Sequence, residues 1–436
     1  MDSLIERPAA GIQIHIAPWV VPIEEEPIRD GAVTVIDGYI SAVGTATELL
    51  ADVRRDGRPV DEHAWEGVLT PGLVNAHSHL QYTCMAEIGR GVYDGFEHWS
   101  RAFQTVYEEA HDWGKSAADG LELAIATGTT AISDIVTDAE AFEVLKHGRV
   151  HGIAYWEVMS WLTEEWNVRG RQATVDLMGA APMEFRGLSP HAPYSLDTDV
   201  IRDLSRLSEE LGVRRHMHLA ESAWEAEYVL SGTGRLADQW RTWGYGDFQV
   251  LRSGGTKLRP VSYAESIGAL GPNTHVAHGI YADADDREIL RRTDTIVALC
   301  PRSNSVIGLD EAPVGAYLRE GNRIAVGTDS LSSTPSLDLM GDVAALYALA
   351  RKQGYASSDL HDRLLAAATL GGAAAMGLDS GAHRIGSLVP EAVADFSVHD
   401  TCAGTAEDVV AALVEAGDGH NMATIISGEI RWQRTN

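Results

Sequence analysis

Residues 69–80 read Leu-Thr-Pro-Gly-Leu-Val-Asn-Ala-His-Ser-His-Leu, a short apolar run that ends in His-x-His. Side chains alternate between the two faces of a strand, so His77 and His79 point the same way and can bind one ion. Two imidazoles at the end of a buried strand need polar partners, and metal binding supplies them. The stretch therefore predicts a buried strand with a metal site at its carboxyl end.

Three later apolar runs also end in polar side chains of the kind that bind metals. They are His-Met-His-Leu-Ala-Glu at 216–221, His-Val-Ala-His-Gly at 275–279 and Ala-Val-Gly-Thr-Asp-Ser at 325–330. The residues alone suggest one shell of five ligands, namely His77, His79, His218, His278 and Asp329. Imidazoles with one carboxylate suit zinc or ferrous iron, and a site not filled by protein leaves room for a water molecule. This combination indicates hydrolytic chemistry.

The middle of the chain, between residues 70 and 385, repeats strand, loop and helix. The eight candidate strands are residues 73–76, 130–134, 152–158, 185–189, 213–219, 274–277, 294–298 and 323–327. Eight such units close into a (β/α)8 TIM barrel, in which active groups stand at the carboxyl ends of strands. Each candidate ligand falls at or just past the end of a candidate strand, which supports both the fold and the site.

The two ends of the chain read as β structure. Asp37-Gly38, between two Val- and Ile-rich runs, is a strong hairpin signal, and residues 394–398 and 422–430 are also strand-like. We therefore expect a composite β-sandwich from residues 1–68 and 386–436, with the barrel over residues 69–385. The fold class is α/β.

Composition narrows the classes of partner. The chain has 63 acidic and 34 basic residues, a formal net charge of -29, which disfavours nucleic acid and anionic membranes. Its start has no signal-peptide pattern, and no apolar run approaches the roughly 20 residues that span a bilayer. Three scattered cysteines are too few for a disulfide framework. We expect a cytoplasmic enzyme with a small-molecule substrate and no membrane or nucleic-acid partner.

The metal motifs, together with two further segments, resemble the amidohydrolase superfamily over nearly the whole chain. These segments are Ser-Pro-His-Ala-Pro-Tyr-Ser at 189–195 and Cys-Pro-Arg-Ser-Asn at 300–304. Within that superfamily the chain is similar to the branch of deaminases and chlorohydrolases that act on purine-like and triazine-like rings. The resemblance implies a homodimer.

The resemblance also assigns roles. It implies that one divalent metal, zinc or alternatively iron, binds His77, His79, His218 and Asp329. It implies that Glu221 shuttles protons and that His278 hydrogen-bonds the attacking water or the ring, which moves His278 out of the ligand set. Binuclear members carry a carboxylated lysine on the fourth strand, and residues 185–189 contain no lysine, so one metal is expected.

In the mechanism we expect, Asp329 takes a proton from the metal-activated water, and Glu221 protonates the ring nitrogen while ammonia leaves. Plainer interpretations stay open at this stage. Glu221 also suits the first turn of a helix, and Asp329 also suits a helix cap.

Four residues are candidate substrate contacts. His191 is one by the resemblance, and Glu157 ends the third strand, where a buried hydrogen-bonded group is the alternative. Gln81 lies in the segment expected to touch the ribose or tail. Arg302 meets either an anionic substrate group or an acidic surface residue.

The substrate is less well defined. The chain is similar to aminodeoxyfutalosine deaminases and methylthioadenosine/adenosylhomocysteine deaminases, which implies an adenine-type nucleoside and release of ammonia. The alternatives are a triazine-type chlorohydrolase or aminohydrolase, a guanine- or cytosine-type deaminase, and a silent scaffold of this fold. Two aromatic segments, 92–107 and 240–260, either pack as core or cover the barrel mouth.

Overall fold

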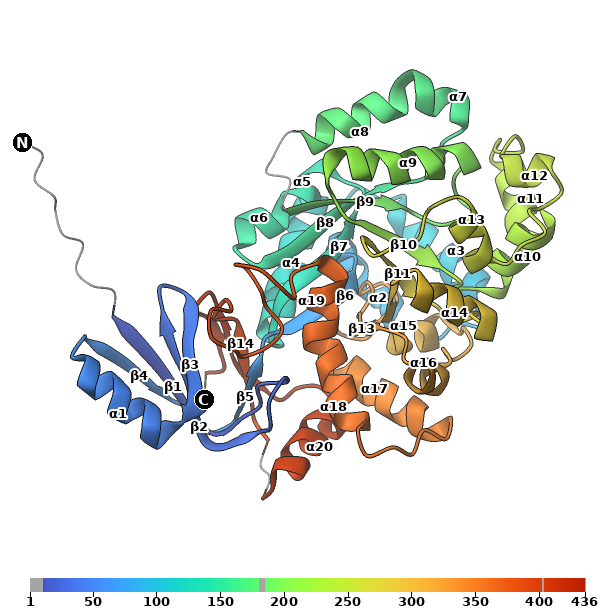
Figure 1. Cartoon of the computed structure of the whole chain (residues 1–436). Coiled ribbons are helices and arrows are strands. Elements are labelled where there is room, and N and C mark those ends of the chain that lie inside the picture. Colours follow the sequence, from blue (N-terminus) through green and yellow to red (C-terminus); the bar gives the residue numbers. More distant parts are fainter. Residues whose placement is uncertain (1–10, 180–184, 402–403, 436) are drawn as a thin grey trace, which may run out of the picture.

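The computed structural model describes residues 11–179, 185–401 and 404–435 and contains two sheets (Figure 1). One sheet belongs to the barrel and the other to the two ends of the chain. Cys402 lies outside the described residues. Of the described cysteines, Cys84 and Cys300 are both free thiols.

The barrel sheet has eight strands that pair in chain order from β6 to β13, and every pair is parallel. This confirms the predicted (β/α)8 fold, with each strand close to its expected position. The strands are β6 (Leu73–Ser78), β7 (Thr129–Val136), β8 (His151–Val158), β9 (Arg186–Pro190), β10 (Arg215–Leu219), β11 (Thr274–His278), β12 (Ile296–Leu299) and β13 (Ile324–Val326).

The first and last strands of the barrel meet through side chains and loop backbone. Asn75 of β6 donates from Nδ2 to Thr328 Oγ1 at 2.8 Å and accepts at Oδ1 from the Thr328 amide at 3.2 Å. The amide of Asp329 donates to the carbonyl of His77 at 2.9 Å. These contacts bring two candidate ligands from opposite ends of the sheet to one place.

Helices surround the barrel strands. In the first half they are η1 (Leu80–Met85), α2 (Ala86–Gly89), α3 (Phe96–Tyr107), α4 (Trp113–Ala126), α5 (Ala139–Phe142), α6 (Val144–Gly148), α7 (Thr163–Glu165), η2 (Trp166–Gly170), α8 (Arg171–Met178) and α9 (Thr198–Leu211). In the second half they are α10 (Ala223–Ser231), α11 (Gly234–Thr242), α12 (Gln249–Arg252), α13 (Pro260–Ser266), α14 (Ala284–Arg292), α15 (Pro301–Ile307), α16 (Val314–Glu320), α17 (Leu339–Lys352), α18 (Leu360–Ala366), η4 (Ala367–Gly371) and α19 (Gly372–Met376).

Local sequence explains why these elements form where they do. Every residue of β6 is buried, as expected for a parallel strand covered on both faces. Helix α9 begins after Asp197, whose side chain accepts from the Thr198 amide, and it ends at Gly212, whose φ of 68° suits glycine. Its apolar stripe packs into the core that joins the barrel strands to the outer helices.

The second sheet combines strands from both ends of the chain in the order β16-β15-β14-β5-β1-β2-β3, with β4 also paired to β1. Its elements are β1 (Ile12–Val20), β2 (Ile28–Ile36), β3 (Tyr39–Thr45), β4 (Val60–Ala64), β5 (Val68–Pro71), β14 (Phe396–His399), β15 (Asn421–Ile426) and β16 (Glu429–Gln433), with helices α1 (Ala46–Asp56) and α20 (Ala406–Ala416). The predicted hairpin is confirmed, because Asp37 and Gly38 join β2 to β3 with φ values of 53° and 81°.

This terminal sheet lies beside the barrel (Figure 1). Two side chains of β15 reach the end of α4: Asn421 donates to the carbonyl of Ala126 at 2.9 Å, and Thr424 donates to that of Ile125 at 2.6 Å. The exact division of the chain at residues 68/69 and 385/386 stays a prediction. Within the described ranges, no helix combines the length and the apolar character needed to cross a bilayer.

Candidate metal centre

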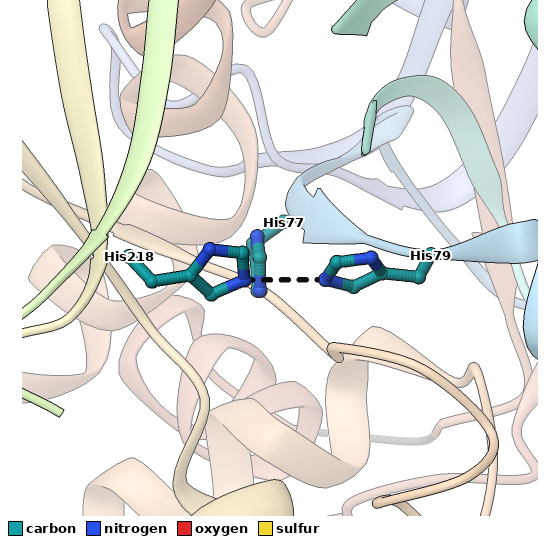
Figure 2. A group of neighbouring side chains, drawn as sticks. All are labelled: His77, His79 and His218. Atoms are coloured by element: carbon teal, nitrogen blue, oxygen red, sulfur yellow. Dashed lines mark hydrogen bonds between the residues drawn. The ribbon is translucent and has the colours of Figure 1, made fainter. Parts of the chain in front are cut away.

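Three imidazoles from two strands meet at the mouth of the barrel. His77 belongs to β6, His79 follows it directly, and His218 belongs to β10; all three are buried. Figure 2 shows their rings converging, with Nε2 of His79 facing Nε2 of His218 at 3.3 Å. The i, i+2 spacing of His77 and His79 places both on the barrel interior, as the sequence predicts.

A carboxylate completes the group. Asp329, just beyond β13, places Oδ1 at 3.6 Å from Nε2 of His77 and 3.7 Å from Nε2 of His79. Donors that each lie about 2.0–2.2 Å from one zinc-sized ion are separated from one another by about 3.3–3.6 Å. The observed separations fit a single ion among these four side chains.

The surroundings also favour metal binding. Nε2 of His77 is buried and has no hydrogen-bond partner, a costly state that a bound cation relieves. Burial holds the pKa of His77 and of His218 well below the usual value, and the neighbouring histidines lower it further. Burial also lowers the pKa of His79 to about 4, although Asp329 opposes this. The rings are therefore neutral at pH 7 and have lone pairs available for a cation.

A second layer of histidines, deeper in the barrel, orients His77. Nδ1 of His77 lies 2.7 Å from Nε2 of His216, and Nδ1 of His216 lies 3.1 Å from the carbonyl of His275. The His216 and His275 rings stack at 3.8 Å. His216 and His218 share a face of β10, as expected. His216 is the deeper of the two, and it fixes the ring of His77 instead of pointing into the proposed metal site.

The carboxylate of Asp329 is held by the following backbone amide and by α15, the helix that precedes β13 in the chain. Ser303 of α15 donates to Oδ2 at 2.6 Å, and the amide of Ser330 donates to Oδ1 at 2.7 Å. Its φ of 62° is unusual for a residue other than glycine. His278 and Ala220 also have positive φ values, 73° and 54°, so three strand ends at this mouth carry backbone strain, which is typical of functional sites.

Glu221 and His278 stand next to each other beside the candidate ligands. Oε1 of Glu221 lies 3.6 Å from Nε2 of His278, and Nδ1 of His278 lies 3.2 Å from Oδ1 of Asn304. Burial raises the pKa of Glu221, and Asp329 raises it further while His278 opposes the shift. Such a carboxyl group suits proton transfer.

The position of His278 also allows it to be a metal ligand. Nitrogen atoms of His278 and His77 and an oxygen of Asp329 lie within 4.8 Å of one another, so geometry alone does not remove His278 from the ligand set.

The loop that carries Glu221 is fixed by a second glutamate. Both oxygens of Glu225 accept from backbone amides, from Ala220 at 2.9 Å and from Glu221 at 2.7 Å. Sequence reasoning missed Glu225, and it also missed the contacts of Ser303 and Asn304. The position of the Cys-Pro-Arg-Ser-Asn segment directly after a barrel strand could have identified the latter two.

Two of the predicted substrate contacts line the cavity over these residues. Nδ1 of His191 lies 2.7 Å from Oγ of Ser195, and the carbonyl of His191 lies 3.2 Å from Nδ1 of His218. Glu157 of β8 places Oε1 at 3.8 Å from that same nitrogen, with no hydrogen-bond partner. Burial, with a further contribution from Asp329, raises the pKa of Glu157 to about 8.

The structure does not place the other two predicted contacts, Arg302 and Gln81, on the lining of this cavity. The Arg302 side chain lies outside the cavity, because it binds the buried carboxylate of Asp342, with Nε 2.9 Å from Oδ2, and donates to Ser336 and Asp338. The amide group of Gln81 is used by Thr137, which it meets at 2.7 Å and 2.9 Å. Gln81 therefore positions Thr137, which does line the cavity, and does not line it itself.

The cavity above the candidate metal centre has a volume of about 350 Å³. Its floor contains three of the proposed ligands, His79, His218 and Asp329, with Glu157, His191, Glu221 and His278 beside them. Both aromatic segments singled out in the sequence contribute to its sides, so neither is simply core. We call the following six residues the aromatic wall: Phe96, Trp99, Phe103 and Tyr107 of α3, Trp240 of α11, and Trp243 directly after it.

Comparison with known proteins agrees with this geometry. The profile of the amidohydrolase family matches residues 68–431. A 5-methylthioadenosine/S-adenosylhomocysteine deaminase from Syntrophobacter fumaroxidans is 30% identical over 386 residues, which are 85% of this chain and 80% of the relative.

Two solved structures share the fold. Helicobacter pylori aminofutalosine deaminase in complex with methylthio-coformycin has a TM-score of 0.81 at 19% identity and covers 96% of this chain and 99% of its own. An adenosine deaminase from Xanthomonas campestris with bound zinc has a TM-score of 0.76 at 23% identity and covers 98% of this chain and 94% of its own.

Proposed function

Because this chain belongs to the amidohydrolase family, we propose that it is a metal-dependent hydrolytic deaminase of adenine nucleosides that are modified at the 5′ position. One observation carries the proposal. Nitrogen atoms of His77, His79 and His218 lie within 4.8 Å of one another, Asp329 lies 3.6–3.7 Å from the first two, and the Glu221–His278 pair lines the substrate-sized cavity beside them. The deaminase names of the relatives support the choice of reaction.

We assign the metal to these four side chains and propose zinc, with ferrous iron as the alternative, because three imidazoles and a carboxylate accept both. The zinc in the Xanthomonas campestris neighbour supports that choice. When bound there, a divalent ion would supply Lewis-acid chemistry that lowers the pKa of a water molecule toward neutrality. The remaining steps depend on the protein's own residues.

Asp329 accepts a proton from the water molecule as its oxygen attacks the ring carbon that carries the amino group. Glu221 donates a proton to the adjacent ring nitrogen, a role that suits its buried carboxyl group and raised pKa. His278, with its ring held by Asn304, hydrogen-bonds the oxygen that has been added. The carbon–nitrogen bond then breaks, Asp329 passes its proton to the departing amine, and the new hydroxyl proton returns to Glu221. One water is consumed and one ammonia is released.

Glu157 and His191 are the proposed contacts to the nucleoside. The unpartnered Oε1 of Glu157 suits a ribose hydroxyl group, which would satisfy both partners. His191 presents a neutral ring beside the ligands, since burial lowers its pKa to about 3. A homodimer and a cytoplasmic location stay predictions.

The test is a screen for ammonia release by the zinc-loaded protein with adenosine, 5′-deoxyadenosine, 5′-methylthioadenosine, guanine, cytosine and chlorinated triazines. We expect ammonia from the adenine nucleosides and conversion to the matching inosines. Turnover of guanine or cytosine alone would move the protein to another deaminase class. Release of chloride from a triazine, without deamination of any nucleoside, would overturn the proposal.

A further inference from the structure

The cavity has two chemically different parts. Its floor is polar and includes the proposed metal ligands His79, His218 and Asp329, whereas the aromatic wall forms a large apolar surface farther out. Ring contacts connect the two: Tyr82 stacks on His79 at 5.5 Å and meets Phe103 edge-on at 5.1 Å. The ring of Tyr82 therefore connects the wall to the proposed ligand His79. A substituent on a nucleoside bound at the floor would reach the wall at this distance.

The apolar face of α3 is only partly covered by protein, through contacts of Trp99, Phe103 and Val106 with the cluster of Tyr82, Met85 and Ile88. Its aromatic residues recur at helical spacing, yet none of the 12 residues of this helix is buried. An amphipathic helix normally buries its apolar face. Three large apolar side chains with exposed surfaces also line this cavity, namely Tyr107 at 39%, Met159 at 38% and Trp243 at 49%. An exposed apolar surface of this kind marks a binding site.

The wall is held in place by contacts between α3 and neighbouring elements. Nε1 of Trp99 donates to the carbonyl of Ser332 at 2.9 Å, which ties α3 to the loop after β13. An ion pair between Glu97 and Arg235 connects α3 with α11. A surface fixed before the ligand arrives loses little entropy on binding, so it can discriminate between substituents.

The charged side chains of the cavity lining limit which substituents can bind there. Among the described residues that line it, none is lysine or arginine, whereas Glu157, Glu221 and Asp329 are acidic. A phosphate or carboxylate packed against the aromatic wall would lose hydration without gaining a cationic partner. Desolvation therefore disfavours such a group here.

Building on the proposed function, we propose that the aromatic wall is the subsite for the 5′ substituent of the nucleoside and selects uncharged apolar or aromatic groups. The occupant packs its 5′ group against α3 and the residues around the end of α11. Nucleosides with a 5′-phosphate or an amino-acid tail are poor substrates. This selectivity is measured by comparing two substrates, 5′-benzylthio-5′-deoxyadenosine and S-adenosylhomocysteine. Both are thioethers, and only the second carries charges on its 5′ group.

The experiment compares kcat/KM across 5′-deoxyadenosine, 5′-methylthioadenosine, the benzylthio compound, S-adenosylhomocysteine and adenosine 5′-monophosphate. We expect the benzylthio compound to exceed S-adenosylhomocysteine by at least about tenfold, and the phosphate to be the poorest. Calorimetric binding of the corresponding inosine products gives the same order without turnover. An equal or higher kcat/KM for the charged thioether would overturn the inference.

Variants of the wall sharpen the test. Trp243→Ala should reduce the ratio of benzylthio to 5′-deoxy activity by about tenfold, while Leu258→Ala, an exposed apolar residue away from the cavity, should not change it. Gln104 lies on α3 at the cavity edge, so Gln104→Arg should raise activity toward S-adenosylhomocysteine while Gln104→Met should not. No gain with the arginine and no loss with Trp243→Ala would place the 5′ group elsewhere.

Failure of this inference differs from failure of the proposed function. If 5′-deoxyadenosine is deaminated but the charged thioether is preferred, the deaminase proposal stands and the apolar subsite is wrong. If no adenine nucleoside releases ammonia and no inosine product binds, both are wrong.

Discussion

Nδ1 of His77 lies 2.7 Å from Nε2 of His216, so one histidine of the barrel interior fixes the ring of a proposed metal ligand. His216 is itself held against the carbonyl of His275. Partners of this kind set the orientation and basicity of a ligand, and their loss typically lowers metal affinity by about 10–100-fold.

We expect His216→Gln to weaken zinc binding within that range, because His77 loses the partner that holds its ring. Competition with a fluorescent chelator measures the dissociation constant directly. His361→Gln, at an exposed ion pair far from the barrel interior, is the matched control. Unchanged affinity in the His216 variant would assign this residue to packing alone.

Glu221→Gln should leave zinc content intact and reduce kcat by about 10²–10⁴-fold, because the amide cannot transfer a proton. Metal analysis and steady-state kinetics on the same sample separate the two properties. Glu227→Gln, an exposed change on the following helix, should behave like the parent protein. If the Glu221 variant turns over normally, the proton donor is another group.

Zinc should stabilise the folded protein because its proposed ligands converge only there. At a free concentration of 100 times the dissociation constant, a ligand that binds only the folded state contributes about 2.7 kcal/mol. Scanning calorimetry of chelator-treated protein should show a higher Tm after zinc is restored. In Asp329→Ala this increase should largely disappear; an equal increase in that variant would place the ion elsewhere.

His151 makes stability depend on pH at the junction of barrel and terminal sheet. Its Nε2 lies 3.4 Å from Oδ1 of Asp395, and the charge of Asp395 is the main cause of its raised pKa. A raised histidine pKa stabilises the fold below the unfolded value of about 6.5, and this contribution is lost as the pH rises through the folded-state pKa.

We therefore expect His151→Gln to lower the free energy of unfolding by about 1–2 kcal/mol at pH 5.5, and by much less at pH 9. Urea unfolding at both pH values measures this difference, with the exposed His147→Gln as control. An equal loss at both pH values would mean that the charge of His151 plays no part.

Arg302 should stabilise the folded protein, because its guanidinium neutralises the fully buried carboxylate of Asp342. Even beside this guanidinium, burial raises the pKa of Asp342 to about 6. Arg302→Met leaves that group without its partner and should cost about 3–5 kcal/mol, whereas the double variant Arg302→Met/Asp342→Leu should recover much of the loss. Urea unfolding measures both. Normal stability together with a raised KM would restore Arg302 as a substrate contact.

The sequence was sufficient for the barrel and for the convergence of the candidate ligands. Strand periodicity assigns His77 and His79 to one side, and the rule that parallel strands end at one rim brings in His218, His278 and Asp329. Neither step requires knowledge of the packing.

Partners across the barrel could not be predicted in this way. Asp342 lies 40 positions after Arg302, and the pairing depends on how α17 packs against α15. The contact of His216 with His77 likewise depends on the relative depth of residues on two strands that are not neighbours in the sheet. Helical spacing identified α3 but could not show that its apolar face lines a cavity as well as packing against the cluster around Tyr82.

The join between the first and last barrel strands has a consequence for biosynthesis. His77 and Asp329 are brought together there by the bond from the Asp329 amide to the His77 carbonyl, although some 250 residues separate them in the chain. A ribosome delivers the histidines of β6 long before β13 exists. The full set of proposed donors can therefore assemble only when the barrel is nearly complete, so binding of a cation by all four would be a late step in folding.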